Sequence, residues 1–136
     1  MKTLTVPARR DRLNEVQGFV DQCLEGLPCD SFAVLTLQIA VEELFVNIAS
    51  YAYAPGSGDA EIRCTVEPEI PHITIQFRDR GIPFNPLAKE DADITLSAEE
   101  REIGGLGIYM VKESMDAVTY DYEDGQNILT IQNTLS

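Results

Sequence analysis

The chain has 136 residues, of which 44% are hydrophobic and 24% charged, a composition typical of one folded globular domain. Its 23 acidic residues against 10 basic ones give a formal charge of −13, which would repel a phosphate backbone and argues against direct nucleic-acid binding. The sequence has neither a signal-peptide core at its N-terminus nor an uninterrupted apolar run approaching the roughly 18 residues of a membrane helix, so we expect a cytoplasmic protein that binds no membrane.

The first third of the chain predicts one strand and two helices. Threonine and apolar residues alternate over residues 3–6, which indicates a short strand. From about residue 10 to 25, apolar residues recur at three- and four-residue steps, as in an amphipathic helix. A second, longer helix is expected to be capped by Asp30 or Ser31 and to run to about Tyr53.

The middle of the chain predicts a strand pair followed by a long loop. Residues 60–67 and 72–79 alternate in polarity and are separated by a proline-containing connection, which favours two antiparallel strands. Between Gly81 and Gly105 the periodicity is lost, and loops of this length inside a compact domain are usually functional.

The last third predicts a helix and a hairpin. Residues 106–115 form a helical pattern opened by glycines, and residues 117–122 and 128–134 read as strands joined around Asp124-Gly125. With helices mostly early and strands paired to their neighbours, the fold class is α/β of the α+β kind. We expect a two-layer sandwich in which a mostly antiparallel, mixed sheet is covered on one face by about three helices.

The three cysteines are Cys23, Cys29 and Cys64. Their number is odd and no Cys-x-x-Cys spacing occurs, so neither a disulfide framework nor a zinc site is indicated. Free thiols, buried or without a role, are the prediction.

Polar residues in three places point to a ligand site. Glu43 and Asn47 lie four residues apart on the second predicted helix and therefore share its face, on the flank of the apolar stripe. Asp79 ends a predicted strand two residues before Gly81, where a ligand could approach the backbone. Taken alone, a Glu/Asn pair on a helix is more often simply exposed to solvent, and an Asp-x-Gly segment is more often an ordinary turn.

The third place is Gly104-Gly105-Leu106-Gly107 at the start of the last predicted helix. Backbone N–H groups without side chains, at the positive end of a helix dipole, form a plausible phosphate cradle. The segment has neither the Gly-x-Gly-x-x-Gly spacing of a dinucleotide fold nor the Gly-Lys-Ser/Thr of a P-loop. Alone, such a segment is more often only a turn.

In this order, the three features resemble the N, G1 and G2 boxes of the GHKL (Bergerat-fold) ATP-binding superfamily. Within it, the chain is most similar to the anti-sigma factor serine/threonine kinases. The resemblance covers nearly the whole chain, read as one ATP-binding domain over residues 1–136, and rests on three segments: Val41-Glu42-Glu43-Leu44-Phe45-Val46-Asn47, Asp79-Arg80-Gly81-Ile82-Pro83-Phe84-Asn85-Pro86 and Gly104-Gly105-Leu106-Gly107-Ile108-Tyr109-Met110-Val111.

The resemblance implies a role for each matching residue. Asn47 would bind Mg²⁺, and Glu43 would be the general base. Asp79 would accept a hydrogen bond from the adenine amino group. Gly81, Gly105, Leu106, Gly107 and Thr130 would make the remaining nucleotide contacts. Residues from about 87 to 103 would form the ATP lid. Pro83, where many relatives have a second glycine, and Tyr51, where many have histidine, depart from the family pattern.

The function implied is an ATP- and Mg²⁺-dependent kinase of a partner-switching system. It would bind a sigma factor and phosphorylate an anti-anti-sigma factor of the STAS type, and the family commonly forms homodimers. The alternative is a nucleotide-dependent binding protein without phosphotransfer. Two further classes share the boxes but fit poorly: a histidine kinase needs a preceding phosphoacceptor helix, and a gyrase-type ATPase needs a transducer domain.

Overall fold

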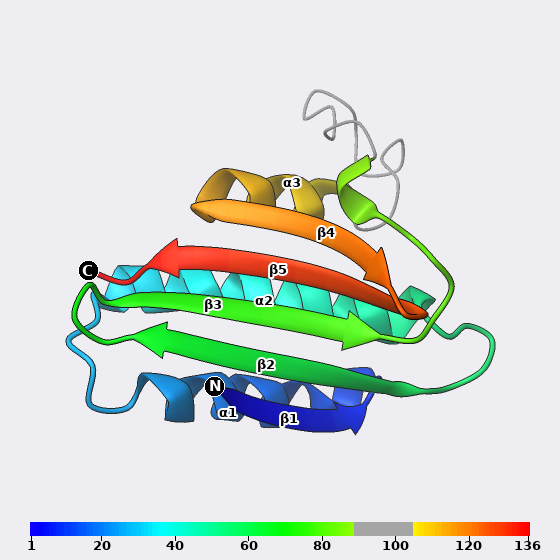
Figure 1. Ribbon diagram of the computed structural model, residues 1–136, viewed down its shortest axis with the longest axis horizontal. Coiled ribbons are helices and arrows are strands. Elements are labelled where there is room, and N and C mark those ends of the chain that lie inside the picture. Colours follow the sequence, from blue (N-terminus) through cyan, green and yellow to red (C-terminus); the bar gives the residue numbers. More distant parts are fainter. Residues whose placement is uncertain (89–104) are drawn as a thin grey trace.

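Among the described residues, five strands form one sheet in the order β1-β2-β3-β5-β4, with three α-helices behind it (Figure 1). The computed structural model describes residues 1–88 and 105–136. The elements are β1 (Lys2–Pro7), η1 (Arg10–Arg12), α1 (Leu13–Leu24), α2 (Ser31–Tyr51), β2 (Asp59–Glu67), β3 (His72–Asp79), η2 (Pro86–Ala88), α3 (Gly105–Ser114), β4 (Ala117–Glu123) and β5 (Gln126–Thr134). Each helix and strand predicted from the sequence is present, with ends shifted by a few residues.

All four described strand pairings are antiparallel, so the sheet is more uniform than the mixed sheet expected from the sequence. The chain reverses sharply between β4 and β5 because two consecutive residues have left-handed backbone conformations. Asp124 and Gly125 both have positive φ angles, of 53° and 77°. Two consecutive residues of this kind match the right-handed twist of a hairpin, and aspartate and glycine tolerate them best.

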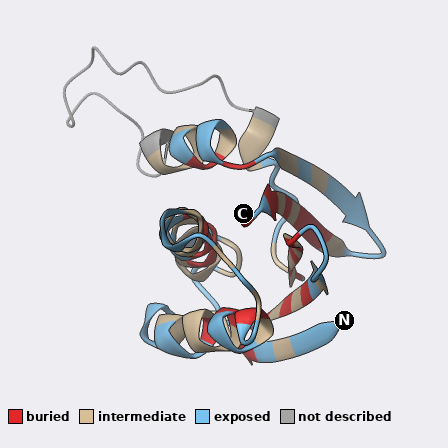
Figure 2. Cartoon of the chain, turned by 90° about the vertical axis from the view of Figure 1, so that its left-hand side faces the viewer, coloured by how far each residue is buried: buried red, intermediate tan, exposed pale blue. Residues whose placement is uncertain are grey.

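The core lies between the sheet and the helices. Figure 2 shows the buried residues gathered where the helix layer meets one face of the sheet. On β3 alternate residues point inward, and Ile73, Ile75 and Phe77 are almost fully buried there. Phe45 of α2 is equally buried on the opposite side of this interface. The opposite face of the sheet has no helix over it among the described elements.

Helix α2 is the central element of the helix layer, between α1 and α3 (Figure 1). Asp30 caps it, because its carboxylate accepts the backbone N–H of Ala33 at 3.0 Å. By length and composition alone α2 could cross a membrane, although its sequence is not an uninterrupted apolar run. Here its apolar side, with Leu37, Val41 and Leu44 buried, belongs to the core of the domain.

Candidate functional site

The C-terminal half of α2 carries the first two predicted site residues. Glu43 and Asn47 are half-buried beside the core, whereas the neighbouring Glu42 is exposed. This confirms the expectation that the two side chains lie on the flank of the apolar stripe. Within the described ranges, no hydrogen bond involves the side chain of Asn47, so its amide oxygen is available to a ligand.

The carboxylate of Glu43 lies directly against the start of α3. A Cβ atom added to Gly107 would lie only 2.0 Å from Oε2 of Glu43, so no larger residue fits at position 107 unless Glu43 moves. The first turn of a helix carries partial positive charge, which favours a nearby carboxylate. Val41 and Phe45 of the same helix are buried in the core. The structure thus joins the first and third predicted motifs.

The rest of the third motif is only partly visible. Gly105 and Leu106 are the first two residues of α3, as the glycine-opened helix predicted. Gly104 and most of the expected lid, about 87–103, fall in the range 89–104 and lie outside the described residues.

Asp79 ends β3 and is 7% exposed. Its Oδ1 atom accepts the backbone N–H of Gly81 at 2.9 Å, which closes a tight turn at the strand end. Gly81 itself touches the end of α2, since an added Cβ would lie 2.1 Å from the carbonyl oxygen of Ala52. The next residue, Ile82, donates its N–H to the same oxygen at 3.0 Å. The Asp-x-Gly loop is therefore fixed to the helix that carries Glu43 and Asn47.

Asn127, at the start of β5, is a site residue that the sequence analysis missed. It stands opposite Asp79 in the sheet and is 6% exposed. Its Nδ2 donates to Oδ1 of Asp79 and to the carbonyl oxygen of Ile82, both at 2.9 Å. Its Oδ1 accepts the N–H of Phe84 at 3.1 Å and the hydroxyl of Tyr120. One amide thus bonds to the carboxylate and to two backbone groups of the loop that follows it.

Two tyrosines support this arrangement. The hydroxyl of Tyr53 accepts the N–H of Arg80 at 2.7 Å and donates to the carbonyl oxygen of Asp59. Burial raises the pKa of Tyr53 and of Tyr120, so both hydroxyls remain protonated and able to donate at neutral pH.

The expectation for Thr130 is not supported by the structure. Thr130 pairs with Gln76, three residues before Asp79 on β3, and successive residues of a strand point to opposite faces. The side chain of Thr130 therefore lies on the face of the sheet away from the helices and from Asp79. On β5 it is Asn127, and not Thr130, that stands beside Asp79.

Replacing Asn127 with alanine tests this network. We expect a loss of about 2 kcal/mol in the free energy of unfolding, because the buried carboxylate of Asp79 loses one of its donors. Urea denaturation measures it. Asn133 is similarly buried on β5, and within the described ranges its side chain bonds only to the N–H of Asp116, so it is the comparison residue. An Asn127→Ala loss no larger than that of Asn133→Ala would contradict the assigned role.

An antiparallel sheet covered on one face by helices, with a carboxylate and an amide on the central helix beside two glycine segments, defines the GHKL-type α/β sandwich. The family model described as "Histidine kinase-like ATPase domain" matches residues 6–133. The chain belongs to this family.

Curated relatives share part of their length with the chain. It is 28% identical over 96 residues to the serine/threonine-protein kinase BtrW of Bordetella bronchiseptica, covering 71% of the chain and 67% of that protein. It is 32% identical over 103 residues to the serine-protein kinase RsbW of Listeria monocytogenes, and 31% to that of Listeria innocua. Each of these two matches covers 71% of the chain and 64% of the relative, slightly less than two thirds of the relative's length.

Proposed function

We propose that this chain is an ATP- and Mg²⁺-dependent serine/threonine protein kinase, built as a single ATP-binding domain. The observation that carries the proposal is the placement of Glu43, whose carboxylate lies against Gly107 at the start of α3. A general base must stand where the phosphate chain ends, and a glycine-opened helix N-terminus is suited to phosphates. The kinase names of the relatives from Bordetella and Listeria support this reading.

In this proposal the nucleotide lies along the C-terminal half of α2. The base is recognised at Asp79, whose Oδ2 has no hydrogen bond among the described residues and can accept from the adenine amino group. Gly81 brings the backbone close to the base. The phosphates extend toward α3, where Gly105, Leu106 and Gly107 present the backbone of its first turn. The two ends are nine residues apart on α2, from Glu43 to Ala52, or about 14 Å along its axis.

Asn47 fits a magnesium ion held mainly by the phosphates. Mg²⁺ usually takes only one or two protein ligands and completes its shell with phosphate oxygens and water. The half-buried amide of Asn47, one turn from Glu43, offers one oxygen of the kind this ion prefers. When bound, Mg²⁺ would neutralise charge on the phosphates.

Glu43 then acts as the base in phosphotransfer. Its carboxylate accepts the proton of a serine or threonine hydroxyl as the hydroxyl oxygen attacks the γ-phosphorus, and ADP leaves. Most of the catalysis of such a transfer comes from positioning and electrostatic stabilisation. The fixed contacts of Glu43 with Gly107 and of Gly81 with Ala52 supply that positioning.

For partners, we propose a sigma factor and a STAS-type anti-anti-sigma factor as phosphorylation substrate, in the cytoplasm, with the chain acting as a homodimer. The experiment is to incubate the purified chain with γ-labelled ATP, Mg²⁺ and candidate STAS proteins from the same genome. Transfer of label to a serine or threonine of the STAS protein supports the proposal. Tight ATP binding with no transfer to any STAS candidate would favour a nucleotide-dependent binding protein instead.

Replacing Asn47 with alanine tests the magnesium assignment. We expect affinity for ATP with Mg²⁺ to fall about tenfold or more, because a metal ligand is lost. Affinity for ATP in excess chelator should change little. Fluorescence titration with a labelled ATP analogue measures both. Asn14→Ala, at an exposed position of α1, is the matched control. An equal loss with and without Mg²⁺ would show that Asn47 does not act through the metal.

A further inference from the structure

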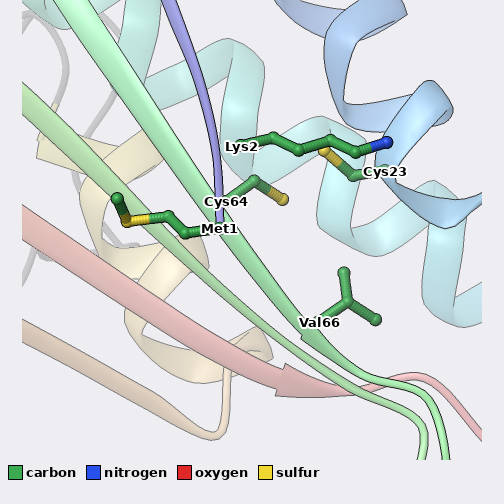
Figure 3. A pocket seen from close by; sticks show the side chains of 5 residues that line it. All are labelled: Met1, Lys2, Cys23, Cys64 and Val66. Carbon is green, nitrogen blue, oxygen red and sulfur yellow. The ribbon is translucent and has the colours of Figure 1, made fainter.

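Two cysteines from separate elements meet at the side of the molecule where α1 packs on β2. Cys23 is on α1 and half-buried, and Cys64 is on β2 and only 2% exposed. Figure 3 shows their sulfur atoms in the space between helix and strand. They border a small open pocket of about 200 Å³, whose other lining residues are Met1, Lys2 and Val66.

We propose that Cys23 and Cys64 form an oxidant-sensitive dithiol, which a small peroxide converts to an intrachain disulfide between α1 and β2. The pocket gives a molecule of that size access to the pair, since it has room for several waters. The third cysteine, Cys29, lies beyond the end of α1 and does not line this pocket. The proposal does not depend on the kinase function.

The exposure of the two thiols sets the order of the reaction. The Cys23 sulfur attacks the peroxide, the O–O bond breaks, and Cys23 sulfenic acid and one water form. The Cys64 sulfur then attacks the Cys23 sulfur: an S–S bond forms, the S–O bond breaks, and the hydroxyl leaves with the Cys64 proton as a second water. Two thiols are oxidised to one disulfide, and one hydrogen peroxide is reduced to two waters.

The surroundings of Cys64 suit the second step and not the first. Burial, followed by the neighbouring Cys23 thiol, raises the pKa of Cys64, and the charge of Lys2 opposes this in part. A protonated, buried thiol reacts slowly with a dissolved oxidant. A sulfenic acid on Cys23 would instead be held next to the Cys64 sulfur, and this proximity favours the intramolecular second step, so Cys64 is the resolving thiol.

The pair is separate from the nucleotide site. Cys64 stands opposite Ile75 in the sheet, four residues along β3 from Asp79. A cross-link there would fix α1 to the sheet and leave α2 and α3 in place. It would join residues 41 positions apart in the chain, and such a cross-link restricts the unfolded state and raises the melting temperature.

The test treats the whole chain with hydrogen peroxide at equimolar and tenfold excess, then alkylates free thiols. Intact mass spectrometry should show the chain minus two hydrogens and carrying one alkyl group, and peptide mapping should find a Cys23–Cys64 disulfide with Cys29 alkylated. Cys29→Ser, the matched control, should give the same cross-link. The oxidised chain should melt at a higher temperature than the reduced chain.

Two single variants keep the proposal open to refutation. Cys64→Ala removes the resolving thiol, so Cys23 should be trapped as sulfenic acid by dimedone, and Cys23→Ser should leave Cys64 unmodified. Cys23 is half-buried, so its replacement is compatible with folding even if Cys64→Ala is not. Recovery of wild-type chain with only intermolecular disulfides, or with Cys23 oxidised and Cys64 still free, would overturn the proposal.

Discussion

Replacing Glu43 with glutamine is expected to lower phosphotransfer by at least about 100-fold, while ATP affinity changes only a few-fold. The amide keeps the size of the carboxylate, so the contact with Gly107 survives, but it cannot accept the hydroxyl proton of the substrate. Single-turnover transfer from labelled ATP to the STAS protein measures the rate. Titration with ATP in the same buffer measures the affinity.

The adjacent Glu42 provides the control for this prediction. It is exposed on the same helix, so Glu42→Gln changes the net charge identically without touching the site. We expect wild-type transfer from Glu42→Gln. If Glu43→Gln transferred phosphate as fast as Glu42→Gln, with ATP bound normally, Glu43 would not be the base.

The fold could be predicted from the sequence because its signals are local. The apolar period of α2, the Asp30 cap and the alternation along β3 depend only on neighbours in the chain. The Asp124-Gly125 turn likewise specifies its own geometry. The order of strands in the sheet has no such local signal, and the sequence left it open.

Thr130 and Asn127 show why the site was harder to predict. Which face a strand residue takes depends on register, and a shift of one residue reverses it. The sequence placed the start of the last strand at Ile128, so Asn127 was left in the turn. In the structure β5 begins at Gln126, and Asn127 stands opposite Asp79 while Thr130 points to the other face. Only the pairing of β3 with β5 decides between them.

The structure gives Gly81 and Gly107 a steric role that the sequence did not indicate. Sequence reasoning explained Gly81 by a ligand that approaches the backbone. In the structure the end of α2 already approaches it, at the carbonyl of Ala52. Gly107 likewise makes room for the carboxylate of Glu43. Contacts between segments far apart in the chain, which no local pattern encodes, account for both.

Replacing Gly81 with alanine is therefore expected to destabilise the fold by about 3 kcal/mol and to abolish measurable ATP binding. The new methyl group would lie 2.1 Å from the carbonyl oxygen of Ala52 and 2.6 Å from its carbon. These are backbone atoms, which cannot turn aside as a flexible side chain can. The loop would have to leave α2, and the hydrogen bonds from Ile82 to Ala52 and from Gly81 to Asp79 would be lost with it.

Gly18 of α1 separates this steric effect from the general effect of adding a methyl group. Apart from the neighbouring backbone of α1 itself, no atom of the described residues lies within 4 Å of a Cβ built there. Gly18→Ala should therefore stabilise the helix by up to about 1 kcal/mol and leave ATP binding unchanged. Urea denaturation and ATP titration of both variants give the comparison. Normal stability and ATP affinity in Gly81→Ala would mean that the loop does not need its contact with Ala52. If Gly81→Ala folded stably but lost affinity for ATP, Gly81 would act only by positioning the Asp79 carboxylate and would not be needed for stability.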